Sequence, residues 1–433
     1  MAAPLNRLEE LLKKKGIGPE GSKSLKQVEL FEVEQLFLNE TYSLTTRATI
    51  LTALLMLPPS EAEARWLSQL QKTYTDILPS SLHFMLKHEA ASNSFEKYLC
   101  RTIEGKDLNY TEAHEAMILL LTNESVPAFQ KGAFLEAQRL KRETFDENKA
   151  FFDVLWNYTS RIQTDLPILI DICDNYDGFN RYNNFAPFFA AAIASCGYPC
   201  IVHGTDEVAP KFGISSKKIM EACKGNSTKS PEKITAQVTT PSIGWGYINQ
   251  SDFHAPLYKL KTIRKEMVKR PFLATFEKMM QPIRAKNGNH ILTGFTHAHY
   301  RTEVAEQLKT QGKSAAAIVV KGLEGSSCPP LNRETIQVIV SGDTITDQQI
   351  NPKEFLSIDS DQLPSKIITA ETTAELGLKA LQGERNEAFY QIIYYTSMVI
   401  TGFKLEAKEI ITKKIEENLL SGKVLTHFLN GLF

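Results

Sequence analysis

The chain has 433 residues, and its 49 lysine and arginine residues almost balance its 50 aspartate and glutamate residues. An apolar fraction of 42% and a charged fraction of 23% are ordinary for a packed globular protein, which excludes a disordered or collagen-like chain. A net charge of −1 excludes a uniformly basic nucleic-acid coat but leaves room for a local basic surface. The length predicts two or three domains, or one sheet with a helical annex.

The cysteines and the N-terminus both indicate a cytoplasmic protein. The cysteines are scattered in apolar sequence, and the close pair Cys196 and Cys200 matches no common zinc or redox spacing. We therefore expect reduced thiols that pack as small apolar side chains. The N-terminal residues lack an apolar signal core, and the longest apolar run, Phe185 to Cys196, is too short to span a bilayer.

The chain is helical in pattern up to about residue 165. Apolar residues recur with the three-to-four spacing of one helix face from Leu5 to Leu12. The same spacing predicts further helices within Phe31–Leu38, Ala48–Leu57, Glu112–Leu121 and Ala128–Leu140.

A weak internal repeat runs through this helical part at a shift of 84 residues. The matching pairs include Leu36 and Leu120, Asn39 and Asn123, Glu40 and Glu124, and Glu63 and Glu147. Each copy contains a hydroxyl residue, Ser60 or Thr144, followed three positions later by a glutamate, which fits a capping box at a helix start. Chance similarity between amphipathic helices is the competing explanation, and two copies are too few for a solenoid.

Beyond residue 165 short apolar strands alternate with helices. The predicted strands are 167–173, 199–203, 291–295, 315–320 and 335–340, and the predicted helices are 186–196, 217–223 and 302–310. Continuous apolar strands between helices are typical of a mainly parallel sheet covered on both faces. The residues from Glu387 to Phe433 return to helical periodicity. We therefore predict an α/β fold: a mainly parallel sheet flanked by helices, plus a helical subdomain and an extra helical N-terminal extension.

Two polar loops follow predicted strands, Asp171–Asn184 and His203–Gly213. Ligands of such sheets bind beyond the carboxyl ends of the strands, so both loops are candidate binding segments. The basic strip, which we define as Lys259–Arg270, holds six positive charges and one negative charge in twelve residues. It is either a solvated helix face or an anion-binding wall.

These loops and several helical motifs resemble one known family. The helical motifs start at Gly105, Glu112, Gly132 and Arg264, and they occur in the family's order. From about Gly105 to its end the chain resembles anthranilate phosphoribosyltransferases, within the glycosyltransferase family 3 and nucleoside phosphorylase group. The resemblance implies a dinucleotide-fold-like sheet and a helical domain, with the ligand site between them. It divides the chain into a helical N-terminal extension (1–95), the family's helical domain (96–165) and an α/β domain with C-terminal helices (166–433).

The resemblance also implies an activity and roles for individual residues. The expected reaction transfers phosphoribosyl from phosphoribosyl diphosphate (PRPP) to a nitrogen of an aromatic or heterocyclic acceptor, with magnesium as cofactor. The implied phosphate ligands are Asp177, Gly178 and Asn183; His203, Gly204 and Lys211 serve the ribose and phosphate, Arg264 the acceptor, and Glu324 the metal. The family further implies a homodimer formed through the helical domain, with no membrane partner.

The phosphate loop and the metal motif depart from the family's pattern. The family's cradle Gly-Thr-Gly-Gly-Asp corresponds here to Asp174–Gly178, in which Tyr176 adds bulk and Asp174 adds a negative charge. The hydroxyl residues expected after Asn183 are absent, and the family's pair of metal-binding acids is reduced to Glu324. The sequence therefore predicts a divergent branch with degenerate PRPP and magnesium motifs.

Two other functions are compatible with the same residues. A related enterobacterial branch keeps the fold and binds nucleic acid, so the main alternative is a non-catalytic binder of nucleic acid or nucleotide that uses the basic strip. A third is an architectural protein that works through its helical N-terminus.

Overall fold

The computed structural model describes residues 5–18, 20–356 and 368–433. These form two compact units. Unit 1 comprises Met1–Tyr158 and Pro256–Phe276, and unit 2 comprises Thr159–Ala255 and Glu277–Phe433. The chain therefore leaves unit 2 after residue 255, adds a short segment to unit 1, and returns.

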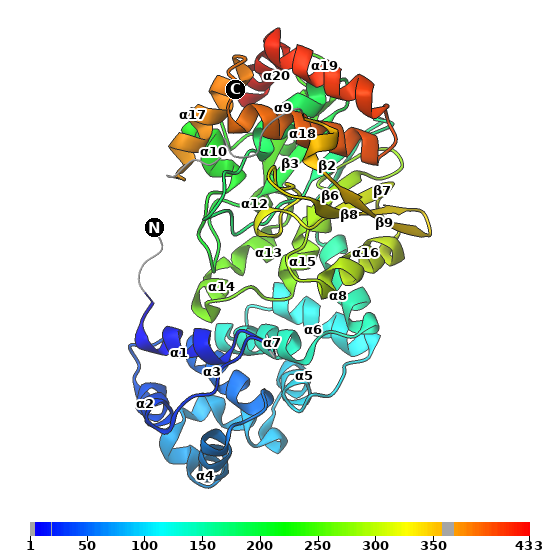
Figure 1. The fold of residues 1–433 in the computed structure, drawn as a ribbon. Helices are drawn as coiled ribbons and strands as arrows, with labels where there is room; N and C mark the ends of the chain where they lie inside the picture. Colours follow the sequence, from blue (N-terminus) through cyan, green and yellow to red (C-terminus); the bar gives the residue numbers. More distant parts are fainter. Residues whose placement is uncertain (1–4, 19, 357–367) are drawn as a thin grey trace. The chain divides into compact units, whose positions relative to one another are not determined.

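Unit 1 consists of helices and connecting turns among the described residues (Figure 1). Its main helices are α1 (Arg7–Lys15), α2 (Gln27–Leu38), α3 (Leu44–Met56), α4 (Glu61–Ile77), α5 (Ser94–Ile103), α6 (Tyr110–Thr122), α7 (Ala128–Lys141) and α8 (Phe145–Asn157). The later segment adds α13 (Ala255–Lys259), α14 (Lys261–Met267) and α15 (Leu273–Phe276). Helices predicted within 31–38, 48–57, 112–121 and 128–140 are confirmed as α2, α3, α6 and α7.

The predicted capping boxes start α4 and α8. At α4 the Ser60 hydroxyl accepts the amide of Glu63, whose carboxylate accepts the amide of Ser60 in return. Thr144 and Glu147 make the same reciprocal pair at α8. Each pair satisfies amides that a helix start would otherwise leave unbonded. The two halves of the helical unit therefore begin their fourth helices in the same way.

Both capping glutamates are buried, and each also binds the backbone of a segment distant in sequence. Glu63 accepts the amide of Leu25 at 3.0 Å, and Glu147 accepts the amide of Leu108 at 3.0 Å. Each carboxylate has a lysine partner: Lys15 lies 2.9 Å from Glu63, and an α7 lysine lies 2.7 Å from Glu147. Because every oxygen of these buried carboxylates has a donor, burial of the two charges is compensated.

Unit 2 is built on a seven-stranded sheet in the order β4-β3-β2-β6-β7-β8-β9. The strands are β2 (Ile170–Ile172), β3 (Cys200–Gly204), β4 (Trp245–Asn249), β6 (His290–Gly294), β7 (Ala316–Val320), β8 (Thr335–Ser341) and β9 (Thr344–Ile350). The strands from β4 to β7 run parallel, and β8 and β9 are antiparallel additions. A separate short pairing joins β1 (Ile162–Gln163) to β5 (Ile283–Arg284). The predicted α/β class with a mainly parallel sheet is confirmed.

Two strands of this sheet, β4 and β9, are not among the predicted ones. Every residue of β4 is buried, but its sequence Trp-Gly-Tyr-Ile-Asn includes a glycine and a polar end that obscure the apolar pattern. β9 is an edge strand, and of its residues Ile350 alone is buried. An exposed edge strand does not need apolar residues, so its sequence resembles a polar loop.

Helices flank the sheet of unit 2 (Figure 1). They are α9 (Ala186–Ser195), α10 (Ser216–Ala222), α11 (Pro231–Thr239), α12 (Gln250–Phe253), α16 (His299–Gln311), α17 (Ala370–Leu381), α18 (Glu387–Gly402), α19 (Lys408–Leu420) and α20 (Lys423–Leu432). All residues of α9 are buried, because it packs against β3 and β4 and against α18, α19 and α20. The long apolar run is thus an enclosed helix.

Aromatic stacking joins the C-terminal helices to this core. Phe428 stacks on Phe188 with ring centroids 4.7 Å apart and on Trp245 with centroids 5.4 Å apart. Tyr395 stacks on Phe189 at 4.0 Å. Each fully buried aromatic side chain contributes about 1.5–3 kcal/mol through removal of its apolar surface from water. The last helices therefore belong to the core of unit 2.

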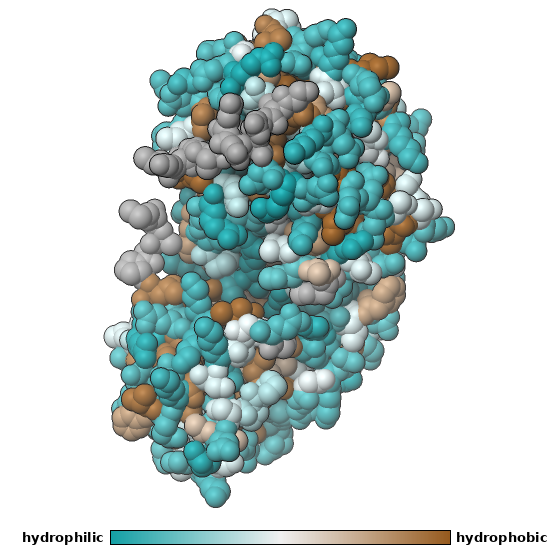
Figure 2. Space-filling view, in the orientation of Figure 1, coloured by the Kyte–Doolittle hydropathy of each residue, from teal (hydrophilic) through white to brown (hydrophobic). Residues whose placement is uncertain are grey.

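The surface and the cysteines agree with the composition. In the face that Figure 2 shows, hydrophilic residues predominate and hydrophobic ones are scattered. The six cysteines are free and buried, as expected for thiols that serve as small apolar side chains. Among the described residues, none of the helices has both the length and the apolar character that a membrane crossing requires.

The two capping glutamates provide a matched test of unit 1. We expect Glu63→Gln and Glu147→Gln each to lower the free energy of unfolding by about 1–3 kcal/mol. Both oxygens of each carboxylate accept hydrogen bonds, and the NH2 group of glutamine, which replaces one of them, cannot accept. Urea unfolding followed by circular dichroism measures the change. The control is Glu61→Gln, an exposed acid in the same helix turn as Glu63. Equal stability of all three variants would contradict this account of the buried carboxylates.

Candidate functional site

The strand order reverses at β2, so the carboxyl ends of the strands beside β2 form the candidate ligand-binding edge of the sheet. From β2 the chain continues through β3 and β4 on one side, whereas β6 and β7 extend the sheet on the other side. Open α/β sheets bind ligands beyond the carboxyl ends of their strands at such a reversal. The loops that leave β2 and β7 meet there: the Asn175 side chain donates to the Glu324 carbonyl at 2.7 Å, and the Ser327 amide donates to Asp174 at 2.8 Å.

Glu324 is the centre of these contacts. Its carboxylate accepts the amides of Asn180 at 2.9 Å and Arg181 at 2.7 Å, and the ammonium group of Lys211 lies 2.7 Å from its other oxygen. Lys211 also donates to the carbonyl of Gly178 at 3.1 Å. Burial alone would raise the pKa of Glu324, but the hydrogen bonds from Lys211, Arg181 and Asn180 lower it below its usual value. The structure thus brings together three residues named from the sequence: Gly178, Lys211 and Glu324.

Gly178 is fixed by a close approach of backbone to backbone. It has φ of 76°, and a Cβ there would lie 2.6 Å from the carbonyl carbon of Gly213. The neighbouring carbonyl of Asp177 accepts the amide of Gly213 at 2.9 Å, and Phe179 pairs with Ile214 in an isolated bridge. This glycine therefore lets the two candidate loops pack against each other.

Asn183 and Asp177 are both buried in this loop region. The Asn183 amide nitrogen donates to Glu387 at 3.1 Å, and its oxygen accepts the hydroxyl of Thr373 at 2.8 Å. These partners lie in α18 and α17. Asn183 thus anchors the loop after β2 to the C-terminal helices.

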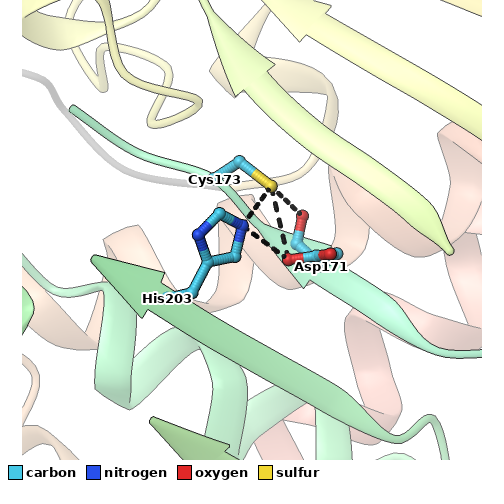
Figure 3. A group of neighbouring side chains, drawn as sticks. All are labelled: Asp171, Cys173 and His203. Carbon is cyan, nitrogen blue, oxygen red and sulfur yellow. Dashed lines mark hydrogen bonds and ion pairs between the residues drawn. The ribbon is translucent and has the colours of Figure 1, made fainter. Parts of the chain in front are cut away.

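His203 lies in an enclosed polar cluster at the end of β3 (Figure 3). Its Nε2 is 3.2 Å from the Asp171 carboxylate and 3.1 Å from the Cys173 sulfur, and its Nδ1 bonds to the Tyr176 hydroxyl. The second oxygen of Asp171 accepts the side-chain amide of Asn289 at 2.8 Å. Gly204 follows His203 and completes the pairing of β3 with β4. The histidine ring is therefore held from both of its nitrogens.

Asp171, Cys173 and His203 are the types of residue that bind zinc, and their ligand atoms lie within 4.8 Å of one another. Burial, and then the nearby Asp171 charge, raise the pKa of the Cys173 thiol well above its usual value. Among the described residues this group offers three such side chains, whereas structural zinc is usually held by four. The cluster is better described as a hydrogen-bond network that fixes the imidazole of His203.

Glu324, as folded, does not fit a magnesium ion. Magnesium is held by carboxylate oxygens, and a second cation on a single carboxylate would compete with Lys211. The Glu324 oxygens already accept two amides and that ammonium group. Magnesium at Glu324 therefore stays a prediction that requires the ion pair with Lys211 to open, and no chemical step is assigned to it.

Arg264 and the basic strip belong to unit 1, whereas the other candidate residues belong to unit 2. Arg264 is buried in α14. Lys269 forms an ion pair with the buried Glu136 of α7, while Lys259 and Lys265 are exposed. The strip is therefore not one continuous cationic face, because some of its charges serve the packing of unit 1.

A cavity of about 430 Å³ adjoins this edge of the sheet, and three cationic residues that were not predicted from the sequence line it: Arg181, Lys321 and Arg333. Lys321 follows β7 directly, and Arg333 lies just before β8. Because β8 is antiparallel to β7, its start lies at the same edge as the end of β7. The position of Lys321 directly after an apolar strand could have marked it as a candidate in the sequence. Arg333 could not be found in this way, because its place depends on the antiparallel direction of β8.

Two acids also line this cavity, and both have partners. Glu324 pairs with Lys211, and Glu334 accepts the side chain of Asn351 at 2.7 Å. The remaining lining includes Gly322 and Thr296. Cationic side chains beside exposed backbone suit an anionic ligand.

Comparisons with known proteins agree with this fold. Residues 96–158 match a family model described as the helical bundle domain of a glycosyl transferase family. An anthranilate phosphoribosyltransferase of Alkalilimnicola ehrlichii is 26% identical over 286 residues, which are 66% of this chain and 82% of that protein. Its counterpart from a Geobacillus species is 25% identical over 335 residues, which are 75% of this chain and 96% of that protein.

Solved structures of anthranilate phosphoribosyltransferases are similar to this chain in fold. The anthranilate phosphoribosyltransferase of Thermus thermophilus has a TM-score of 0.63 at 19% identity, covering 77% of this chain and 98% of that one. The Saccharomyces cerevisiae enzyme, in complex with PRPP and Mg, has a TM-score of 0.64 at 14% identity and covers 81% of this chain and 98% of that one.

Residues 96–158 therefore match the helical bundle domain of a glycosyl transferase family. Over most of its length the chain is similar to anthranilate phosphoribosyltransferases, and the resemblance to that family is confirmed.

The ion pair of Glu324 generates a pH-dependent prediction. The pKa of Glu324 is lower in the folded state than its usual 4.5, so its stabilising effect is complete above that pH and is lost as the pH falls through the folded pKa. We expect Glu324→Gln to lower the free energy of unfolding by about 1–3 kcal/mol at pH 7, and this difference to shrink below pH 4.5.

Urea unfolding of unit 2 at several pH values measures this difference. Glu409→Gln, which alters an exposed acid of α19, is the control and should match the wild type. A difference between wild type and Glu324→Gln that stays constant across the pH range would show that the charge of Glu324 is not the stabilising element.

Proposed function

We propose that the protein is an anthranilate phosphoribosyltransferase-like enzyme that transfers phosphoribosyl from PRPP to a nitrogen of an aromatic or heterocyclic acceptor. The observation that carries the proposal is the cationic cavity at the carboxyl edge of the sheet, lined by Arg181, Lys321 and Arg333. A diphosphate is the most anionic part of such a donor, and this edge is where ligands of open α/β sheets bind. The yeast neighbours, described as complexes with PRPP and Mg and with 4-fluoroanthranilate, lend support to a donor and an acceptor of this chemistry.

The cationic residues supply electrostatic stabilisation in the proposed reaction. The acceptor nitrogen forms a bond to C1 of the ribose as the bond from C1 to the diphosphate oxygen breaks. The electron pair of the broken bond leaves with the diphosphate, and the proton of the nitrogen passes to solvent. Guanidinium groups bind phosphate oxygens through two parallel hydrogen bonds, so Arg181 and Arg333 stabilise the charge that develops on the leaving group.

The loops supply the fixed frame of the site in this proposal. The Glu324–Lys211 pair holds the amides of residues 180 and 181, and Arg181 is thereby held at the cavity. The family resemblance assigns His203 to the ribose and phosphate. In this proposal His203 also fixes the position of Tyr176 in the loop after β2, through its hydrogen bond with the Tyr176 hydroxyl. Arg264 remains our candidate for the acceptor carboxylate, on the strength of the family resemblance.

A specific observation favours non-catalytic binding as the second candidate. The side chains of Asn183 and Glu324, which the family resemblance assigns to phosphate and metal, are engaged in internal hydrogen bonds. A cationic cavity without those ligands would hold a nucleotide or a nucleic-acid phosphate and leave it unchanged.

Calorimetric titration with PRPP tests the cavity. We expect Arg333→Ala to weaken PRPP binding about tenfold to a hundredfold, because a charged hydrogen bond contributes about 1.5–3 kcal/mol. The control is Lys413→Ala on α19, whose side chain is 79% exposed, and it should bind PRPP like the wild type. Equal affinity of Arg333→Ala and wild type would exclude the cavity as the PRPP site.

A turnover assay separates the two candidate functions. Product formation from PRPP and anthranilate, or a related aromatic amine, is expected for the enzyme and should fall with Arg333→Ala. Tight PRPP binding with no product, together with salt-sensitive retention of a single-stranded oligonucleotide, would favour the binder.

A further inference from the structure

The N-terminal helices α1–α4 follow one another in the same order as α5–α8, and three of their ends match in structure. Asn6 and Asn93 cap α1 and α5 by accepting the amide three residues later. Asn39 and Asn123 end α2 and α6 with nearly identical backbone angles, φ of −81° and −85° with ψ of 107° in both. The capping boxes of α4 and α8 follow the same shift of 84 residues as these two C-caps. Chance similarity of amphipathic helices does not explain three matching caps in the same order, two of them at the same shift of 84 residues.

We propose that residues 7–77 are a second copy of the helical bundle domain, that the two copies pair within one chain as the halves of a two-fold dimer do, and that the chain is therefore a monomer. The family model matches residues 96–158, which span most of α5–α8. The additional copy that we propose, residues 7–77, lies outside that match. The proposal concerns unit 1 and is independent of the proposed activity.

The two copies meet through equivalent helices, α3 and α7 (Figure 1). Near the start of both helices, a Cβ on Gly132 would lie 2.5 Å from a methyl group of Thr45. Near their ends, Ala53, Leu57 and Leu140 form one buried cluster. The helices therefore lie side by side and run in the same direction, with equivalent levels in contact.

A two-fold axis that runs between two parallel helices produces this pattern. In a self-complementary interface the same patch is used by both partners, so equivalent positions meet at the axis. Met56 and Leu140 are equivalent at the shift of 84 residues, and both belong to the cluster at the helix ends. Ala48 and Gly132 are likewise equivalent, and both are small and buried.

A third segment covers the pair. The helix α14 contacts both α3 and α7. The Thr46 hydroxyl of α3 donates to the carbonyl of Glu266 at 2.9 Å, and Ile263 lies 3.5 Å from the Cβ position of Gly132. The face that α3 covers on α7 is therefore sealed, and a second chain has no access to it. The pairing in one chain takes the place of the homodimer that the family resemblance implies.

Cysteine cross-linking in the full chain tests the pairing. The variant Ala53→Cys/Leu140→Cys is oxidised under mild conditions, and the two single variants and the wild type, whose own six cysteines are buried, are the controls. We expect a disulfide within one chain, with a yield that does not change over a hundredfold range of protein concentration. A covalent dimer whose yield rises with concentration, or an absence of linkage in the folded variant, would overturn the proposal.

A measurement on the unmodified chain covers the case in which that variant does not fold. Sedimentation equilibrium of the wild type should give the mass of one chain at micromolar concentration. A stable species of twice that mass would overturn the proposal.

Discussion

The buried carboxylate of Glu324 is the interaction on which the ligand side of the sheet depends. It collects two consecutive amides and one ammonium group from segments that lie more than a hundred residues away in the sequence. These are the donors that also bind a phosphate oxygen at loops of this kind. Here the Glu324 carboxylate occupies the place that a phosphate would take, and it holds the loops in their shape without a ligand. Anion binding is then left to the side chains that line the neighbouring cavity.

The near-neutral total charge includes basic residues that are paired inside the fold. Cations of the basic strip are used inside unit 1, where Lys269 neutralises Glu136, and Lys211 is used inside unit 2. Arginine and lysine at the sheet edge are left facing the cavity. The total charge of a chain therefore does not indicate where the chain attracts an anion. The position of the unpaired cationic side chains decides that, because the two charges of a buried ion pair largely cancel each other.

Much of the fold follows from the sequence, because helix periodicity, capping residues and apolar strands act locally. The helices α3 and α7 and the strands β3 and β7 were predicted within a few residues. The edge strand β9 and the direction of β8 were not, since both depend on pairing across the sheet and not on local pattern. For the site, Gly178, Lys211 and Glu324 were each named through the family resemblance, and the structure shows that they are in contact; their roles toward a ligand stay predictions. Arg333 was not named, because it joins the cavity only through the antiparallel turn of the sheet.

The discontinuity of unit 1 has a consequence for the order of events during synthesis. The bundles end at residue 158, but α14, which covers α3 and α7, is not made until about a hundred residues of unit 2 have been added. Domains generally begin to fold as they emerge from the ribosome. The paired helices therefore exist with one apolar side open to water while the first strands of unit 2 are being translated. A nascent chain halted between residues 158 and 256 would expose the surface that the finished protein seals.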